Sequence, residues 1–209
     1  MKYLPTLAAG LLIGAAALQF ATTASGQGDG WVKLIDGNYK AADWAEVGKA
    51  NWEFKDGALM ADKLESKDPS YLVSKDSYKD FVIRAEFWAE TDTNSGIFLR
   101  LSDRTTITSA NSYEVNIWDV RPDPKYGTGA IVDFAAVPVP IANKAGGRWN
   151  TYEIEARGSK VTVTLNGVVT ATMDNGKFTS GPFALQMGPG VQGVQGGPIK
   201  WRKVQVKAL

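Results

Sequence analysis

The feature that most constrains the fold is a series of short segments, from Trp31 to the C terminus, in which apolar and polar residues alternate. A period of two is typical of a β-strand with one buried face, and no apolar pattern of helical period exceeds about two turns. Turn signals such as Asn166-Gly167 and Asn175-Gly176 separate the segments, because both residue types tolerate positive φ. The pattern predicts an all-β fold. The expected strands are 81–90, 95–101, 112–118, 149–157, 160–165, 168–173, 182–187 and 199–207.

The alternation also predicts two packed sheets. In the segment 81–88, Phe81 and Ile83 alternate with Val82 and Arg84, which gives each strand one apolar and one wet face. Two such sheets bury their apolar faces against each other in a sandwich. A chain of 209 residues is long enough for one well-buried domain, and we expect a single one. The Pro- and Gly-rich stretch 121–147 is expected to be loop.

The N-terminal 26 residues have the composition of a secretory signal peptide: basic Lys2, an apolar run from Leu7 to Leu18, and small residues at Ala24 and Gly26. We expect the mature domain to span 27–209, with cleavage after Ala24 as the alternative. A membrane anchor is disfavoured, because a spanning helix needs about 20 apolar residues. Without cysteine there is no lipid-acceptor residue. The expected location is therefore the periplasm or the medium, with no membrane anchor after cleavage.

Charge and residue usage exclude several functions. The chain has 23 basic and 22 acidic residues, so loss of Lys2 leaves a balance near zero and no basic run for nucleic acid. There is no histidine, which excludes a Ser-His-Asp triad and a His-based zinc site. The sequence requires no cofactor. A metal, if one binds, would have oxygen ligands only, which favours calcium or magnesium. Nothing in the sequence indicates the oligomeric state.

Three segments place polar and aromatic residues on what should be one sheet face. Alternation around Ile97 and Leu99 leaves Phe98 and Arg100 on the opposite face. In the next segment, the residues that alternate with the apolar positions 115 and 117 are Glu114, Asn116 and Trp118. If these strands are adjacent to 81–90, the face presents an arginine, two carboxylates, an amide and aromatic rings. Rings that stack on C–H faces and fixed polar groups are typical of a sugar site. The set is Arg100, Phe98, Glu114, Asn116, Trp118, Glu86 and Trp88.

A solvated face, with Arg100 and Glu114 as an ordinary cross-strand ion pair, is the alternative. The number of aromatic residues favours the sugar site, because exposed aromatic clusters are unusual unless covered or used. The remaining tryptophans lie in or beside apolar runs and are expected in the core: Trp31, Trp44, Trp52, Trp149 and Trp201.

Several runs, in this order and at these spacings, resemble the 3-keto-disaccharide hydrolase domain family. They are Asn94-Ser-Gly-Ile-Phe-Leu-Arg, Tyr113-Glu-Val-Asn-Ile-Trp-Asp, Thr128-Gly-Ala-Ile-Val-Asp, Gly147-Arg-Trp-Asn-Thr-Tyr-Glu, Leu165-Asn-Gly and Ile199-Lys-Trp-Arg-Lys-Val. The resemblance covers roughly Trp31 to Leu209. It implies a concanavalin A-like jelly roll of two antiparallel sheets with a concave ligand face, and action on glycosides oxidised to a ketone at C3.

That resemblance implies a reaction. A C3 ketone acidifies the C2 proton, so a base removes it, the enolate expels the C1 oxygen, and water adds later. By resemblance Glu114 is the base or a metal ligand, Arg100 stabilises the enolate, and Asn116 and Gln186 position hydroxyl groups. Asp119 would assist from the strand end.

Two departures from the family pattern bear on catalysis. Members often carry histidine shortly after the Asp119 and Gln186 positions, where this chain has Val120-Arg-Pro-Asp and Met187-Gly-Pro-Gly. The family's amide after the glutamate is usually Gln, whereas here it is Asn116. A non-catalytic, lectin-like module is therefore the alternative to keto-glycoside cleavage. Ordinary two-carboxylate hydrolysis is disfavoured, because the odd spacing of Glu114 and Asp119 puts them on opposite faces.

Overall fold

The structure is a computed structural model that describes residue 1 and residues 29–209. The predicted signal peptide, apart from Met1, and both expected cleavage points lie outside the described residues. Within the described part, no helix is long and apolar enough to cross a membrane.

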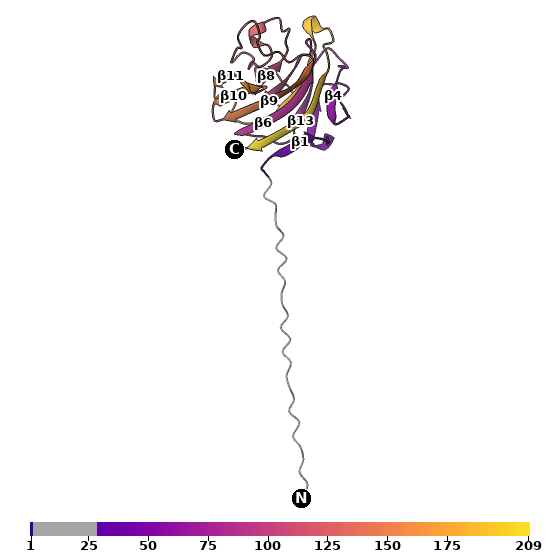
Figure 1. The fold of residues 1–209 in the computed structure, drawn as a ribbon, viewed down its shortest axis with the longest axis vertical. Coiled ribbons are helices and arrows are strands. Elements are labelled where there is room, and N and C mark those ends of the chain that lie inside the picture. Colours follow the sequence, from indigo (N-terminus) through magenta and orange to yellow (C-terminus); the bar gives the residue numbers. More distant parts are fainter. Residues whose placement is uncertain (2–28) are drawn as a thin grey trace.

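The larger sheet has eight antiparallel strands (Figure 1). Its order is β11-β10-β9-β6-β13-β4-β3, and β1 pairs with the C-terminal half of β13. The strands are β1 (Val32–Asp36), β3 (Glu53–Lys55), β4 (Ala58–Ala61), β6 (Phe81–Ala89), β9 (Arg148–Arg157), β10 (Lys160–Leu165), β11 (Val168–Asp174) and β13 (Ile199–Ala208).

The smaller sheet has five antiparallel strands in the order β2-β5-β12-β7-β8. They are β2 (Trp44–Val47), β5 (Ser70–Ser74), β7 (Ser95–Leu99), β8 (Tyr113–Ile117) and β12 (Ala184–Met187). Three short 3₁₀ helices complete the described elements: η1 (Ala41–Asp43), η2 (Pro124–Tyr126) and η3 (Val191–Gly193). In Figure 1, η2 and η3 lie at the end of the sandwich away from the C terminus.

The inner faces of the two sheets share one core. Ile83 and Phe87 of β6 and Ile154 of β9 join Ile97 of β7 and Val115 of β8 in a single buried cluster. The inner face of each of these strands is removed from water, as the alternation of apolar and polar residues predicted. The all-β, two-sheet jelly-roll prediction is confirmed.

The predicted strands are found, with ends that differ by no more than two residues. The stretch 121–147 is mostly loop, as expected, and contains η2 and two isolated bridges from Ile131, to Val115 and to Ala135. Of the tryptophans expected in the core, Trp44 and Trp201 are buried. The expectation for Trp149 is wrong, because it occupies an outward position of β9 and is half-buried.

The outer faces of the two sheets differ. On the eight-stranded sheet the outward residues are exposed or half-buried, as the burial patterns of β6 and β9 show. On the five-stranded sheet every residue of β5, β7, β8 and β12 is buried, on both faces. Part of this cover is a loop in which Ile107 packs with Tyr71 and Phe98. A polar group that is buried without a hydrogen-bond partner lowers the stability of the fold. Such groups on this buried outer face therefore mark a candidate site.

Candidate functional site

Strand pairing brings a carboxyl group and two amides together on the outer face of the five-stranded sheet. Glu114 lies opposite Phe98 and Asn116 lies opposite Gly96 across β8 and β7. Leu185 lies opposite Ile97, so the same register places Gln186 opposite Gly96. A Cβ on Gly96 would lie 3.6 Å from Cγ of Glu114 and 2.9 Å from the backbone oxygen of Val115. We call Glu114, Asn116, Gln186 and Gly96 the Glu114 site.

In both amides of the Glu114 site the nitrogen is bonded, and the oxygen has no partner among the described residues. Asn116 Nδ2 donates to the backbone oxygen of Tyr126 at 2.6 Å, and Gln186 Nε2 donates to Tyr71 Oη at 3.3 Å. Asn116 Oδ1 and Gln186 Oε1 are buried and accept no hydrogen bond from residues 29–209. A buried acceptor without a donor costs about 1–3 kcal/mol, so a ligand that donates here would recover that cost.

The Glu114 carboxyl group is buried with no hydrogen-bond donor among the described residues. Its pKa is raised from 4.5 to about 7, mainly by burial; the charge of Arg121 opposes this rise and the charge of Asp133 adds to it. A carboxyl group with a pKa near neutral has a large unprotonated fraction and still accepts a proton readily, as a general base requires. Arg100, considered above as an ion-pair partner of Glu114, does not contribute to this shift in pKa.

The two charged neighbours of Glu114 were missed by sequence reasoning, because both lie in the stretch expected to be loop. Val132 N donates to the backbone oxygen of Glu114 at 2.9 Å, which brings Asp133 beside the strand. Arg121 lies over the ring of Trp118 at 5.6 Å from its centroid. The apolar run Ala130-Ile131-Val132 within a polar loop was the available signal.

Arg100 is not part of the site, and its expected position beside Glu114 is wrong. Its φ of 52° ends β7 after Leu99, so the alternation that links Phe98 with Arg100 does not continue. The side chain is fully buried and donates to the backbone oxygens of Lys79, Gly158 and Phe178, with Asp80 at 3.4 Å. Arg100 is a structural residue that joins these segments.

Glu86 and Trp88 are also displaced from the expected face. Their strand, β6, belongs to the eight-stranded sheet and pairs with β9 and β13, not with β7. Glu86 points outward there, where it accepts from Arg202 at 2.6 Å and pairs with Lys203 at 3.1 Å. The two residues therefore lie on the opposite side of the molecule from Glu114.

Phe98 does lie on the face of the Glu114 site, but it is covered. It is 2% exposed and packs edge-on against Tyr71, with ring centroids 5.3 Å apart. Its ring is already packed in a small apolar cluster with Tyr71 and Ile107. Trp118, directly after β8, is half-buried, and its Nε1 is a buried donor that has no partner within the described residues. It is the aromatic residue that a ligand at this site can still engage.

Asp119 holds loops in place. Its carboxylate accepts from Thr128 Oγ1 at 2.6 Å, from Ala145 N at 3.0 Å and from Gly146 N at 2.9 Å. These bonds occupy both oxygens and fix two loop segments to the end of β8. An assisting role in catalysis would require breaking them.

Comparison with known families assigns nearly the whole described chain to one of them. The model of the 3-keto-alpha-glucoside-1,2-lyase-like domain family matches residues 30–207. The chain belongs to this family. No curated protein matches its sequence at a significant level. The lyase-like domain thus fills nearly all of the described chain, and the Glu114 site lies within it.

Solved structures share the fold of this lyase-like domain. A protein from Parabacteroides distasonis, provisionally assigned as a glycosyl hydrolase, is 23% identical with a TM-score of 0.62, over 86% of this chain and 99% of its own. A second such protein from the same organism is 17% identical with a TM-score of 0.65, over 86% and 94%. The carbohydrate-binding module CBM66 from Bacillus subtilis is 15% identical with a TM-score of 0.56, over 86% and 96%.

The described residues contain no group of three or more His, Cys, Asp or Glu side chains that could hold a metal ion. The other oxygen atoms near Glu114 are the two amide oxygens of the site and the carboxylate of Asp133. Calcium or magnesium therefore stays a prediction that binding assays must test.

Proposed function

We propose that this lyase-like domain binds carbohydrate at the Glu114 site and that, on a glycoside with a ketone at C3, Glu114 removes the C2 proton. One observation carries the proposal: a buried carboxyl group whose pKa is raised to about 7 lies on the same face as two buried amide oxygens that have no donor in the described part of the chain. Sugar hydroxyls are donors that such oxygens lack. Family membership and the carbohydrate-related neighbours support a sugar as the ligand.

The reaction follows from the chemistry of a 3-keto sugar. Glu114 takes the C2 proton, and the electron pair forms the enolate of the C3 ketone. The enolate then collapses to a C1=C2 double bond, restores the ketone and expels the glycosidic oxygen, which takes a proton from water. The hydroxide left behind adds to C1, and Glu114 returns its proton to C2. The balance is hydrolysis, with one water consumed.

Each remaining group has a part in this proposal. The amide nitrogens of Asn116 and Gln186 are held by Tyr126 and Tyr71, so both side chains present oxygen and would accept from sugar hydroxyls. The positive charge that stabilises the enolate oxygen would come from Arg121. This arginine has no ion-pair partner among the described residues, and its charge lowers the pKa of Glu114.

The test is incubation of the protein with 3-keto-trehalose and 3-keto-lactose, with and without calcium, magnesium or manganese, following glucose release. Glu114→Gln should lower turnover by at least about 100-fold, the usual contribution of a general base, because only the charge is lost. Glu86→Gln, the same substitution on the other sheet, is the matched control. Glucose release that survives in Glu114→Gln would remove Glu114 from the reaction.

A second candidate function is sugar binding without catalysis. It is favoured by the positions of two charged residues expected to serve the reaction and one expected to bind the sugar: Arg100 is fully buried in structural hydrogen bonds, Asp119 is bonded to two loop segments, and Glu86 lies on the other sheet. Saturable binding of the same keto sugars, with no glucose release under any metal condition, would establish this function instead.

We also place the protein in the periplasm or the medium, on the basis of its N-terminal sequence. N-terminal sequencing of the exported protein should give a start near Gln27. A chain that retains Met1 would contradict this location.

A further inference from the structure

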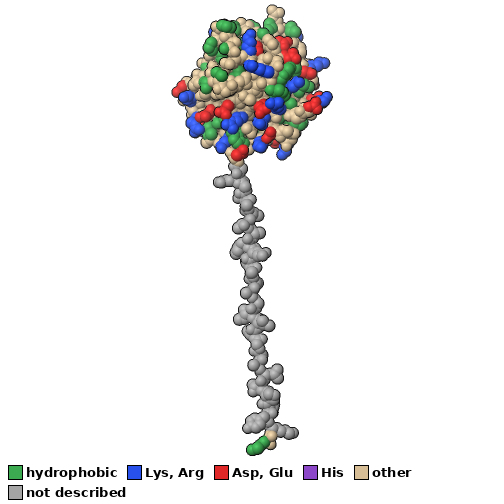
Figure 2. All heavy atoms as spheres, viewed as in Figure 1, with side chains coloured by type: hydrophobic (Ala, Val, Ile, Leu, Met, Phe, Trp, Pro, Cys, Tyr) green, Lys and Arg blue, Asp and Glu red, His purple; other side chains and the backbone are tan. Residues whose placement is uncertain are grey.

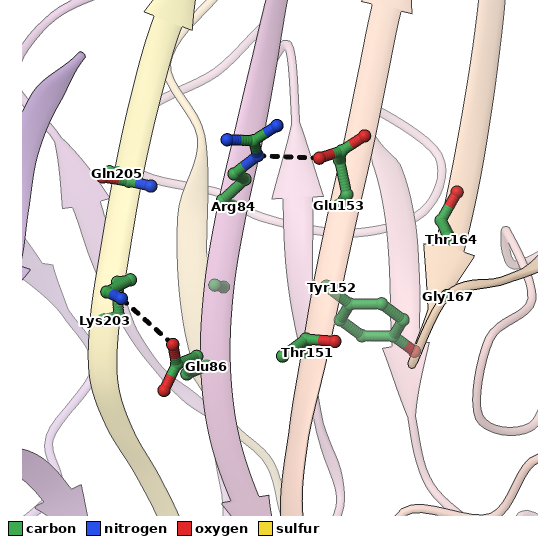
Figure 3. Close-up of a pocket in the computed structure, with 10 residues that line it drawn as sticks. Arg84, Glu86, Thr151, Tyr152, Glu153, Thr164, Gly167, Lys203 and Gln205 are labelled. Carbon is green, nitrogen blue, oxygen red and sulfur yellow. Dashed lines mark hydrogen bonds and ion pairs between the residues drawn. The ribbon is translucent and has the colours of Figure 1, made fainter. Parts of the chain in front are cut away.

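The outer face of the eight-stranded sheet contains a hollow of about 460 Å³ that the Glu114 site does not use. Arg84 and Glu153 are bonded at 2.7 Å across one end, and Lys203 and Glu86 at 3.1 Å across the other; both ion pairs are marked by dashed lines in Figure 3. Each cation in the hollow is thus matched by a carboxylate. Figure 2, viewed in the same direction as Figure 1, shows basic and acidic groups interspersed on the visible surface. A hollow with balanced charge suits a neutral polar ligand better than an ion.

Uncharged polar groups line the hollow between these two ion pairs. The side chains of Thr151, Thr164 and Gln205 border it and make no hydrogen bond with the other residues drawn in Figure 3. Hydroxyl and amide groups of this kind both donate and accept. They match the hydroxyl groups of a sugar.

An aromatic pair continues the hollow along the same strands. Trp88 of β6 lies directly opposite Trp149 of β9, two residues beyond the pair Glu86 and Thr151. Both rings are half-buried on the outer face. The guanidinium of Arg202 lies 4.2 Å from the ring centroid of Trp149, and the same group bonds Glu86 at 2.6 Å. We call the hollow together with Trp88 and Trp149 the tryptophan strip.

A bulge in β13 supplies the charged side of this strip. The register between β13 and β6 shifts between Trp201 and Lys203, so Arg202 and Lys203 both reach Glu86. Bulges re-aim side chains in this way and are often found beside binding sites. The ion pairs fix their donors in place before a ligand arrives, which lowers the entropy lost on binding.

We propose that the tryptophan strip is a second carbohydrate-binding site, specific for a neutral oligosaccharide that lies along β6 and β9. From Arg84 to Trp88 the strip runs about 13 Å at the usual strand rise, longer than one sugar ring. The oligosaccharide stacks on Trp88, contacts Trp149 beside the guanidinium of Arg202, and hydrogen-bonds to Thr151, Glu153 and Gln205 in the hollow. Lys200, which lies 4.7 Å from the ring centroid of Trp88, is partly exposed and is readily displaced into water.

This site would hold a longer glycan on the side of the molecule opposite the Glu114 site. Binding at the two sites is independent in this arrangement, because they lie on the outer faces of different sheets. The proposal does not depend on whether the Glu114 site cleaves keto-glycosides.

The test is calorimetric titration of the protein with cellohexaose, maltohexaose and xylohexaose, up to 10 mM. At least one should bind the wild type, and the double variant Trp88→Ala with Trp149→Ala should weaken that binding at least tenfold. Glu114→Gln should bind the hexasaccharide with unchanged affinity. Arg157→Met is the matched control, since Arg157 lies on the same face of β9 beyond the strip, paired with Glu155.

If the double tryptophan variant does not fold, Thr151→Val with Gln205→Leu removes hydrogen-bonding groups only and should weaken binding at least fivefold. The proposal is overturned if none of the three sugars binds, if binding survives both sets of substitutions, or if Glu114→Gln alone abolishes it. The last result would assign the hexasaccharide to the Glu114 site.

Discussion

The outer faces of the two sheets use polar groups in different ways. On the eight-stranded sheet, Arg84 is paired with Glu153 and Arg202 with Glu86, and these side chains are exposed or half-buried. On the five-stranded sheet, Glu114, Asn116 and Gln186 are buried, and no described residue donates a hydrogen bond to the two amide oxygens. Exposed pairs cost little and stabilise little, whereas buried unpaired groups reduce stability. The comparison teaches that the number and sign of the charges do not locate the Glu114 site, whereas buried polar groups without partners do.

The largest expected difference is between a buried arginine, Arg100, and an exposed one, Arg84 on the eight-stranded sheet. Arg100→Met removes a buried cation and leaves the backbone oxygens of Lys79, Gly158 and Phe178 without donors, so the free energy of unfolding should fall by about 3–5 kcal/mol. Arg84→Met, which breaks an exposed ion pair, should cost less than about 1 kcal/mol. Urea unfolding of both variants measures the two costs. Equal losses would mean that Arg100 is not held as the structure shows.

Glu114→Gln should change the pH dependence of stability. The folded-state pKa of Glu114 is raised from 4.5 to about 7. The stability that its protonated form contributes is therefore fully present below pH 4.5 and is lost as the pH rises through about 7. At pH 8 the variant should be more stable than the wild type by at most about 3 kcal/mol, and at pH 4 the two should be equal. Thermal unfolding at both pH values is the measurement, with Glu153→Gln as control. A variant less stable than the wild type at pH 8 would show that the carboxylate has a partner.

Gln186→Met tests an unpartnered amide at smaller cost. It removes a buried oxygen that accepts nothing, while Tyr71 Oη still donates to the backbone oxygen of Ile107 at 3.2 Å. Stability should stay within about 1 kcal/mol of the wild type or increase, and the affinity for 3-keto-trehalose should fall about tenfold. Urea unfolding and titration with 3-keto-trehalose check both parts. A large loss of stability with unchanged affinity would make Gln186 a structural residue.

The sequence predicted the longer strands well, because each has one apolar and one wet face. It did not locate β5, since all five residues of Ser70–Ser74 are buried and alternation is lost. Nor did it locate β3, which has only three residues. The assignment of strands to sheets could not be read from alternation, which is why Glu86 and Trp88 were grouped with Glu114.

The candidate site was predictable in part. The sequence grouped Glu114 with Asn116 by alternation, and the family resemblance added Gln186. Arg100 was misplaced because a single positive φ ended the strand, and alternation contains no signal for that. Asp133 and Arg121 lie in a loop whose contact with β8 depends on the bridge between Ile131 and Val115, a non-local contact.

The most direct measurement is a map of side-chain NMR signals during titration with 3-keto-trehalose. The account predicts shifts at the side-chain amides of Asn116 and Gln186 and at the indole NH of Trp118, with little change at the indole NH groups of Trp88 and Trp149. Shifts confined to Trp88 and Trp149 would contradict it and would place the keto sugar on the other sheet.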